Sequence, residues 1–220
     1  MLSMLSDAVR VRRITAGSCL IAAPLLLLLG DVLGTRGPTT PADYLTAVAQ
    51  NPSANYANIV LAIYGFALMV PAIFGIMHLL RRHSVALGHL GGALAILGFV
   101  SFAAVAGTEM INIPASDPQA DRKEMLALID RLGTSAAYGL INISEALGVL
   151  FGFLLLAVAL FRARVVPRAL AILLAAGVIS RFIPASPYLA VIVSDALLFF
   201  ALAGVGLVIL SQSDEEWGRV

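Results

Sequence analysis

The sequence predicts an all-α membrane protein: a polytopic bundle of six transmembrane helices with both chain ends in the cytoplasm. Three observations lead to this fold class, namely the composition, the length of the apolar segments and the placement of the basic residues. The 220 residues are 60% hydrophobic and only 12% charged, with a mean hydropathy of +0.96, whereas soluble domains carry about 25% charged residues. A lipid bilayer is therefore the expected solvent.

Six segments are long and apolar enough to cross a bilayer, which takes about 20 residues of helix. The first segment follows a basic N-terminal stretch, as the apolar region of a secretory signal peptide does. Because Asp31 and Gly34 do not form a small-residue cleavage site, we interpret this segment as a retained span. The fifth is short, and Arg168 and Pro184 bound it, so we expect it to tilt little or to end below the interface. We predict one transmembrane domain over residues 1–220, with spans at 14–33, 56–80, 87–113, 135–161, 169–183 and 188–210.

The basic residues predict the orientation, because positively charged loops stay in the cytoplasm. With the N-terminus inside, the inner segments hold Arg10, Arg12, Arg13, Arg81, Arg82, Arg162, Arg164, Arg168 and Arg219. The outer segments hold only Arg36, Arg122, Lys123, Arg131 and Arg181. This distribution favours an N-in, C-in topology.

Segments outside and between the spans also carry signals. Apolar residues recur on one helical face over 121–132, which predicts a short amphipathic helix on the outer interface, with a solvated linker as the alternative. The acidic tail 214–220 is expected to be frayed, although Trp217 could anchor it at the inner headgroups. Small residues favour close approach of helices, here Gly91, Gly92, Gly98, Gly139, Gly148 and Gly152.

Polar side chains inside the spans are the most informative feature, because charged groups are costly in hydrocarbon and usually mark a site there. With the predicted topology they all fall in the outer half of the membrane, and several share a helical face at spacings of three, four or seven residues. We predict that they line one outward-opening cavity: Asp31, Asn58, Glu109, Asn112, Tyr138, Asn142, Ser144, Glu145, Arg181, Tyr188, Ser194 and Asp195.

The acidic members of this set suggest proton chemistry. Four carboxyl groups, those of Asp31, Glu109, Glu145 and Asp195, accompany the single cation of Arg181. Since an excess of buried negative charge is unfavourable, at least one carboxyl is expected to be protonated, and a neutral carboxylic acid in a dry pocket can donate its proton. Alternatively, these groups only hydrogen-bond the helices together, and Asp31 and Arg181 reach the interface.

Several classes of function are excluded or disfavoured. A net charge of +1 gives no broad basic surface, so we expect no nucleic-acid partner. The single Cys19 has no cysteine to pair with and no zinc-binding spacing around it. His78, His83 and His89 lie on the cytoplasmic side, where they could ligate haem or a metal but are more often interfacial residues. No cofactor-binding motif is present, so neither a cofactor nor a metal is expected.

Two resemblances extend these inferences. Segments 74–82, 91–98 and 161–170 resemble those of small multi-span membrane proteins common in actinobacteria, which implies a bacterial inner membrane. By its size and its isolated intramembrane acids, the chain is also similar to the integral membrane terpene cyclases of actinomycete natural-product pathways. Those enzymes protonate an alkene or epoxide of a prenylated substrate. On chemistry alone, the catalytic candidates are Glu109, Glu145 and Asp195.

The sequence is compatible with three functions. In the first, an enzyme binds an isoprenoid or other lipid-like molecule from the bilayer, Glu145 or Asp195 donates a proton, and the other acid stays ionised near Arg181. Its aromatic faces would be Tyr138 and Tyr188, which stabilise a developing cation. The substrate-binding candidates are Tyr138, Asn142, Arg181, Tyr188 and Asn112.

The other two functions use the same acids differently. A small proton- or cation-coupled transporter would need a polar path through the inner half, which is almost uniformly apolar apart from His78, although a homodimer could supply one. A non-catalytic membrane subunit, in contact only with membrane lipids and a protein partner, would tolerate carboxylate substitution.

Overall fold

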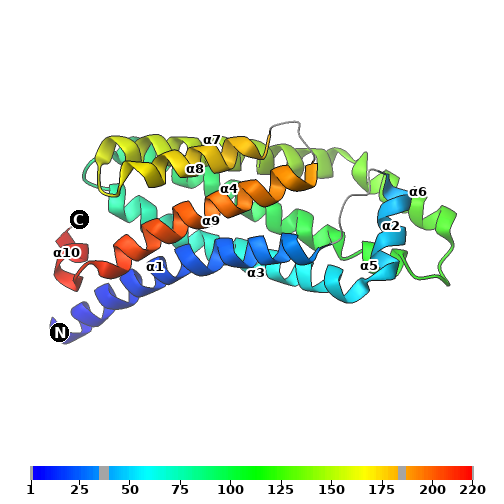
Figure 1. Ribbon diagram of the computed structural model, residues 1–220, viewed down its shortest axis with the longest axis horizontal. Coiled ribbons are helices and arrows are strands. Elements are labelled where there is room, and N and C mark those ends of the chain that lie inside the picture. The colour runs from blue at the N-terminus through cyan, green and yellow to red at the C-terminus, as the bar shows by residue number, and fades with distance from the viewer. Residues whose placement is uncertain (1, 35–39, 183–186, 220) are drawn as a thin grey trace.

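The computed structural model describes residues 2–34, 40–182 and 187–219, and it is an all-α bundle that is 88% helical, with no strand in these ranges (Figure 1). The long helices are α1 (Leu2–Leu33), α3 (Pro52–Leu80), α4 (Val85–Glu109), α7 (Ala136–Ala163) and α9 (Pro187–Ser211). The shorter helices are α2 (Pro41–Gln50), α5 (Asn112–Ala115), α6 (Arg122–Gly133), α8 (Arg168–Ser180) and α10 (Asp214–Arg219). The predicted fold class is therefore confirmed at the level of an all-α bundle.

Five of the helices in the described ranges are long and apolar enough to cross a membrane. They correspond to the first, second, third, fourth and sixth predicted spans. The third begins at Val85, but its regular helix α4 ends at Glu109 rather than at Ile113. Pro114 explains this early end, because its ring would clash with the carbonyl of residue 110 and it has no N–H to donate there.

The predicted fifth span corresponds to α8, which has only 13 residues. At about 1.5 Å per residue this helix is roughly 20 Å long, which is less than the roughly 30 Å of a hydrocarbon core. It begins after Pro167, whose fixed φ suits the residue before a first helical turn, and it ends before Arg181. Ile183 and Pro184, used in the prediction, lie outside the described residues, as does Arg36.

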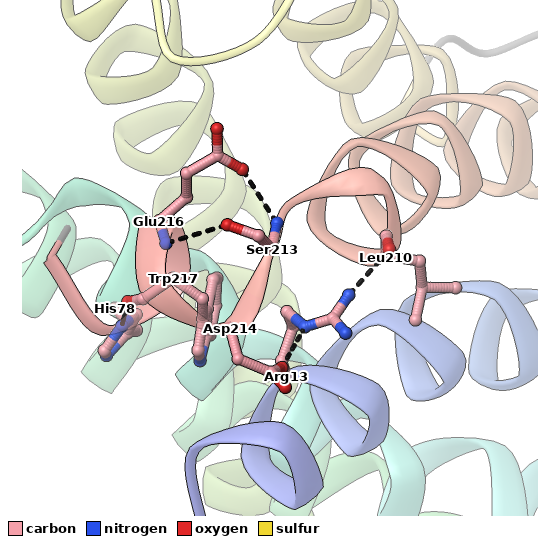
Figure 2. Close-up of polar contacts among 7 residues, drawn as sticks. All are labelled: Arg13, His78, Leu210, Ser213, Asp214, Glu216 and Trp217. Atoms are coloured by element: carbon pink, nitrogen blue, oxygen red, sulfur yellow. Dashed lines mark hydrogen bonds and ion pairs between the residues drawn. The ribbon is translucent and has the colours of Figure 1, made fainter. Parts of the chain in front are cut away.

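The two chain ends lie together at one end of the bundle (Figure 1). There, α10 turns back toward α1 and α3 (Figure 2). The Arg13 Nε donates a hydrogen bond to Asp214 Oδ1 at 2.9 Å, and the indole of Trp217, 2% exposed, packs 4.2 Å from the His78 ring between centroids. The prediction of a frayed tail was wrong, because an ion pair and a buried aromatic side chain hold it.

The opposite end of the bundle carries α2, α5 and α6 (Figure 1). The α6 helix confirms the helix predicted over 121–132, and the Asp121 carboxylate caps it by accepting hydrogen bonds from the next backbone N–H groups. The α2 helix was not predicted, although Thr40 as N-cap and Pro41 in the first turn are helix-start signals. Arg122 of α6 donates hydrogen bonds to the Ala42 carbonyl and the Thr46 hydroxyl of α2.

Glycines set the closest helix contact of the bundle, between α4 and α7. A Cβ placed on Gly148 would lie 2.8 Å from the Cα of Gly98, and one placed on Gly152 would lie 2.4 Å from the backbone nitrogen of Ala95. The predicted close approach is therefore confirmed at these positions and at Gly91. The remaining two glycines differ: Gly92 faces Met77 of α3, and Gly139 has no neighbouring atom within 4 Å.

Candidate active-site cavity

A partly open cavity of about 170 Å³ lies in the half of the bundle far from the chain ends. Side chains from α1, α3, α4, α7, α8 and α9 line it, so six segments distant in sequence converge there. The structure brings together five of the polar side chains that the sequence placed in one cavity: Asp31, Asn58, Glu109, Arg181 and Asp195.

Helical spacing explains how each segment presents several side chains to this cavity. Residues three or four apart, and those seven apart, lie on the same face of a helix. The helices α1, α3 and α4 each follow this rule with an apolar run and one polar residue near the end of the bundle far from the chain termini. The runs are Pro24, Leu27 and Asp31 on α1; Asn58, Ala62, Phe66 and Met69 on α3; and Phe99, Phe102, Ala106 and Glu109 on α4.

Asp195 is the most deeply buried of the acids in the cavity, at 5% exposure. Its Oδ1 accepts a hydrogen bond from Arg181 Nη1 at 3.1 Å. Its Oδ2 is buried and accepts no hydrogen bond from an N–H or hydroxyl group in the described ranges. The carboxyl group of Asp31 lies within hydrogen-bonding reach of the Asp195 carboxyl. Because two carboxyl groups can hydrogen-bond only when one carries a proton, this pair is suited to holding a proton at the cavity wall.

Neighbouring groups hold the two acids in place. Asn58 Nδ2 donates a weak hydrogen bond to Asp31 Oδ1 at 3.4 Å, across the contact between α3 and α1. Ser194, fully buried, donates through its hydroxyl to the carbonyl of Gly177 at 2.8 Å and so ties α9 to α8. These contacts fix the helices that carry Asp31 and Asp195.

Three phenylalanines form the aromatic wall of the cavity. Phe66 stacks on Phe102 with 4.7 Å between ring centroids, and Phe99 lies 5.9 Å from Phe66. The guanidinium carbon of Arg181 lies 5.3 Å from the centroid of the Phe102 ring, within the range of a cation–π contact. The wall can therefore face a positive charge. Sequence reasoning missed these rings, although the pair at 99 and 102 has helical spacing and points to the same face as Glu109.

Glu109 lies where α4 ends, close to α2. Tyr44 of α2 donates its hydroxyl to Asn55 Oδ1 at 3.4 Å. Burial, and secondly the negative charge of Glu109, raise the pKa of Tyr44 to about 12. Tyr44 therefore remains a neutral phenol beside the acid. It was not among the predicted site residues because α2 was not recognised.

Glu145 does not line the cavity, although it was a leading candidate from the sequence. It lies one helical turn from Val149, which is the contribution of α7 to the wall. The Glu145 carboxyl interacts electrostatically with Arg181 and Glu109. Its Oε2 is buried and has no hydrogen-bond partner in the described part of the chain. Glu145 therefore sits beside the polar end of the cavity.

The remaining predicted binding residues, Asn112, Tyr138, Asn142 and Tyr188, do not line the cavity either. Asn142 Nδ2 donates to the carbonyl of Tyr138 on its own helix at 2.9 Å. Side chains in the first turns of α7 lie beyond the level of Val149, so helical spacing alone overestimated how far the cavity extends. The aromatic surface expected from Tyr138 and Tyr188 comes from phenylalanines of α3 and α4 instead.

The described ranges contain no group of three or more His, Cys, Asp or Glu side chains arranged to hold a metal ion. No protein-family model, no curated protein and no solved structure matches the chain. We therefore infer the function from the bundle and its cavity, which belong to a helical membrane protein with several spans.

Proposed function

We propose that this protein is an integral membrane enzyme that protonates an isoprenoid or similar lipid-like substrate with a carboxylic acid, in the manner of a terpene cyclase. One observation carries the proposal: the neighbouring carboxyl groups of Asp31 and Asp195, with Arg181 beside them, lie in the same cavity as a wall of three phenylalanines. Proton donor, counterion and cation-stabilising surface are the three parts that such chemistry needs.

The proposed reaction needs no co-reactant. The O–H bond of the acid breaks, and the π electrons of a substrate alkene form a C–H bond with the proton, which leaves a carbocation on the substrate. Arg181 stabilises the new carboxylate, and the ring faces stabilise the cation. Attack by a second alkene closes a ring, and loss of a proton to Glu109 restores a double bond. The product is an isomer of the substrate, and the site is restored when Glu109 releases its proton to water and the aspartate pair takes one up. Glu145 is the alternative donor.

The size of the cavity limits what enters it. A cavity of about 150 Å³ lined by apolar side chains holds one benzene molecule. The cavity here, at about 170 Å³, therefore holds roughly one isoprene unit with little room to spare. We infer that the reacting end of the substrate enters among the helices while the rest of its chain stays in the bilayer.

The interior of the other half of the bundle supports an enzyme over a transporter. A transporter needs polar groups along a path across the membrane. Here Ile73, Ile76, Phe153, Leu156 and Leu160 are all 0% exposed and fill the space between α3 and α7. Protons or cations leaving the acidic cavity would meet this apolar packing.

The proposal includes a topology of six crossings, N-in and C-in, in a bacterial inner membrane. Five crossings would leave the chain ends on opposite sides, whereas Arg13 and Asp214 form an ion pair at 2.9 Å. The α8 helix, which packs against α7 and α9, supplies the sixth crossing. Nine of the 14 basic residues lie at the end with the chain termini, which supports a cytoplasmic position for that end.

An activity assay with isotope labelling tests the function. Purified protein in lipid nanodiscs is incubated with prenyl alcohols, prenylated aromatics and their terminal epoxides, and products are identified by mass spectrometry. We expect an isomer of one substrate that gains one deuterium when it is formed in D₂O. Asp195→Asn and Asp31→Asn should lower the rate by about 100-fold or more, because a general acid contributes about 10² to 10⁴.

A matched control separates chemistry from general damage. Asp130→Asn removes an exposed carboxyl of α6 that lies outside the cavity, and it should leave the rate unchanged. Full activity in Asp31→Asn, Asp195→Asn and Glu145→Gln would refute acid catalysis. Product without added deuterium would show that protonation is not the reaction.

A further inference from the structure

A second cavity lies at the basic end of the bundle and takes no part in the chemistry proposed above. It has a volume of about 340 Å³ and runs between α1 and α3, with Trp217 of α10 in its lining. We propose that this groove binds one anionic phospholipid, with the phosphate between Arg12 and His78 and an acyl chain along Phe74.

Among the described residues, no acidic side chain lines the groove, whereas the basic side chain of Arg12 does. Arg12 lines the groove, is exposed, and has no hydrogen-bond or ion-pair partner in the described ranges. Its neighbour Arg13 is already paired with Asp214. Both Arg12 and Arg81 act electrostatically on His78. An anion bound in the groove beside Arg12 would therefore gain a favourable charge interaction.

The walls of the polar part are held in place. His78 Nε2 donates to the carbonyl of Trp217 at 3.0 Å, since a carbonyl oxygen can only accept. Arg81 donates to the carbonyl of Gly218 at 3.0 Å. Arg13 donates to the Leu210 carbonyl at 2.7 Å (Figure 2). The first two contacts position α10 and the third holds the end of α9 that leads into it, so the groove exists before a ligand arrives.

The rest of the groove is apolar and faces outward. Val11 and Phe74 are 62% and 54% exposed, and Pro71, Ala16 and Gly75 complete this part of the lining. From His78 to Pro71 the groove follows α3 for about 10 Å at about 1.5 Å per residue. A soluble anion would leave this strip uncovered, whereas a phospholipid covers it with an acyl chain.

The surroundings match the charge of such a lipid. Basic pockets between helices at the membrane surface attract anionic headgroups, and nine of the 14 basic residues lie at this end of the bundle. A tryptophan at this depth is also typical of the interface between headgroups and hydrocarbon. Groove shape, unpaired charge and location therefore favour the same ligand.

The chain contains one tryptophan, and it lies in the groove, so its fluorescence reports on the ligand directly. The full-length protein is placed in phosphatidylcholine nanodiscs that contain increasing fractions of phosphatidylglycerol with brominated acyl chains, which quench indole at close range. The reverse series uses brominated phosphatidylcholine in phosphatidylglycerol. We expect the anionic lipid to be preferred by about fivefold, which corresponds to about 1 kcal/mol.

Two variants on the same helix test the assignment. Arg12→Gln should remove the preference, whereas Arg10→Gln, which makes the same charge change about 200° around the helix, should keep it. Melting temperatures of both variants show that each is folded. Equal quenching by the two lipids, or equal loss in the two variants, would overturn the proposal. So would inorganic phosphate that abolishes the preference, because it would identify a free anion as the ligand.

Discussion

Arg181 contacts both kinds of group that define the acidic cavity. Its guanidinium bonds to Asp195 at 3.1 Å and lies over the ring of Phe102. Asp31, Glu109 and Asp195 line the same cavity, so this one cation faces three carboxyl groups. Its side chain is 26% exposed, against 6% for Asp195. Loss of the arginine should therefore destabilise the charge of Asp195 more than loss of Asp195 destabilises the charge of the arginine.

Replacing the arginine tests this dependence. Arg181→Met should lower the free energy of unfolding by about 2–3 kcal/mol: a broken buried pair costs about 3–5 kcal/mol, and partial exposure of the arginine reduces that. Denaturant unfolding in detergent gives the value. The double variant Arg181→Met with Asp195→Asn should recover part of the loss, because no unpaired charge remains. A double variant as unstable as the sum of the single ones would contradict the pairing.

Among the elements, α4 and α7 depend most on small residues. The atoms that a Cβ on Gly148 would meet are the carbonyl oxygen of Leu94 at 2.7 Å and the backbone of Gly98 at 2.8 Å. Backbone atoms cannot rotate away as a side chain can. A larger residue here must separate the two helices.

Gly148→Ala should therefore destabilise the protein by about 1–3 kcal/mol, in the range found for overpacked sites. Gly139→Ala on the same helix is the control, since nothing lies within 4 Å of its Cβ position and alanine favours helix more than glycine does. It should leave the unfolding free energy unchanged or raise it. Equal losses in both variants would show that helix spacing is not the cause. Parallel unfolding curves of the two proteins give the comparison.

The short helix α10 depends on a capping box. The Ser213 N–H donates to Glu216 Oε2 at 2.7 Å, and the Glu216 N–H donates to Ser213 Oγ at 3.1 Å (Figure 2). These hydrogen bonds hold the pKa of the Glu216 carboxyl below its usual value. The ionised form is thus favoured in the folded helix, and the cap loses strength when acid protonates it.

This predicts an acid-induced release of α10. The contribution of Glu216 is complete above the pKa of an unfolded glutamate, about 4.3, and is lost as the pH falls through the lower pKa of the folded state. Fluorescence of Trp217 should follow the release. Glu216→Gln, which keeps the cap without a titrating group, should move the transition to lower pH, while Glu215→Gln should not. An unchanged transition in Glu216→Gln would exclude the cap as its cause.

At the scale of the whole molecule, α8 decides whether the chain crosses the membrane five or six times. It is too short to cross by itself, yet the contact between α1 and α10 places both chain ends at one end (Figure 1). Its start follows the basic turn at Arg162, and its end leads to Arg181 at the acidic cavity. The helix therefore runs from the end of the bundle with the chain termini to the level of the acidic cavity.

Cysteine labelling tests this path. In a Cys19→Ala background, Arg162→Cys should react with a membrane-impermeant maleimide only after cells are opened, and Phe182→Cys should react in intact cells. Both positions are exposed. Labelling of the two from the same side would mean that α8 does not carry the chain across. Labelling of both in the reverse sense would refute the N-in, C-in orientation alone.

Much of the fold could be predicted because hydrophobic length is a local property. The apolar helices α1, α3, α7 and α9 are each long enough to cross a bilayer, so their existence follows from burial in lipid. The third predicted span, 87–113, lies within one apolar segment from Val85 to Ala115, although the regular helix α4 ends at Glu109 because Pro114 acts one turn upstream. Because α2 was not predicted, Tyr44, which lies beside Glu109, was not predicted as a site residue either. The cavity's polar residues were predictable from their positions along the helices, since Asp31, Asn58 and Asp195 all lie toward the end of the bundle far from the chain termini.

The sequence by itself determined that the chain is a helical membrane protein with acids gathered toward one end, because hydrophobicity and charge act through position along each helix. Only the tertiary structure decided which acids meet: Asp195 faces Asp31 and Arg181, while Glu145 stays outside the cavity lining. It also decided that Trp217 docks against His78. Such pairings depend on the rotation of each helix and on how closely it approaches its neighbour. Glycine contacts between segments distant in sequence set both, and no local sequence pattern encodes them.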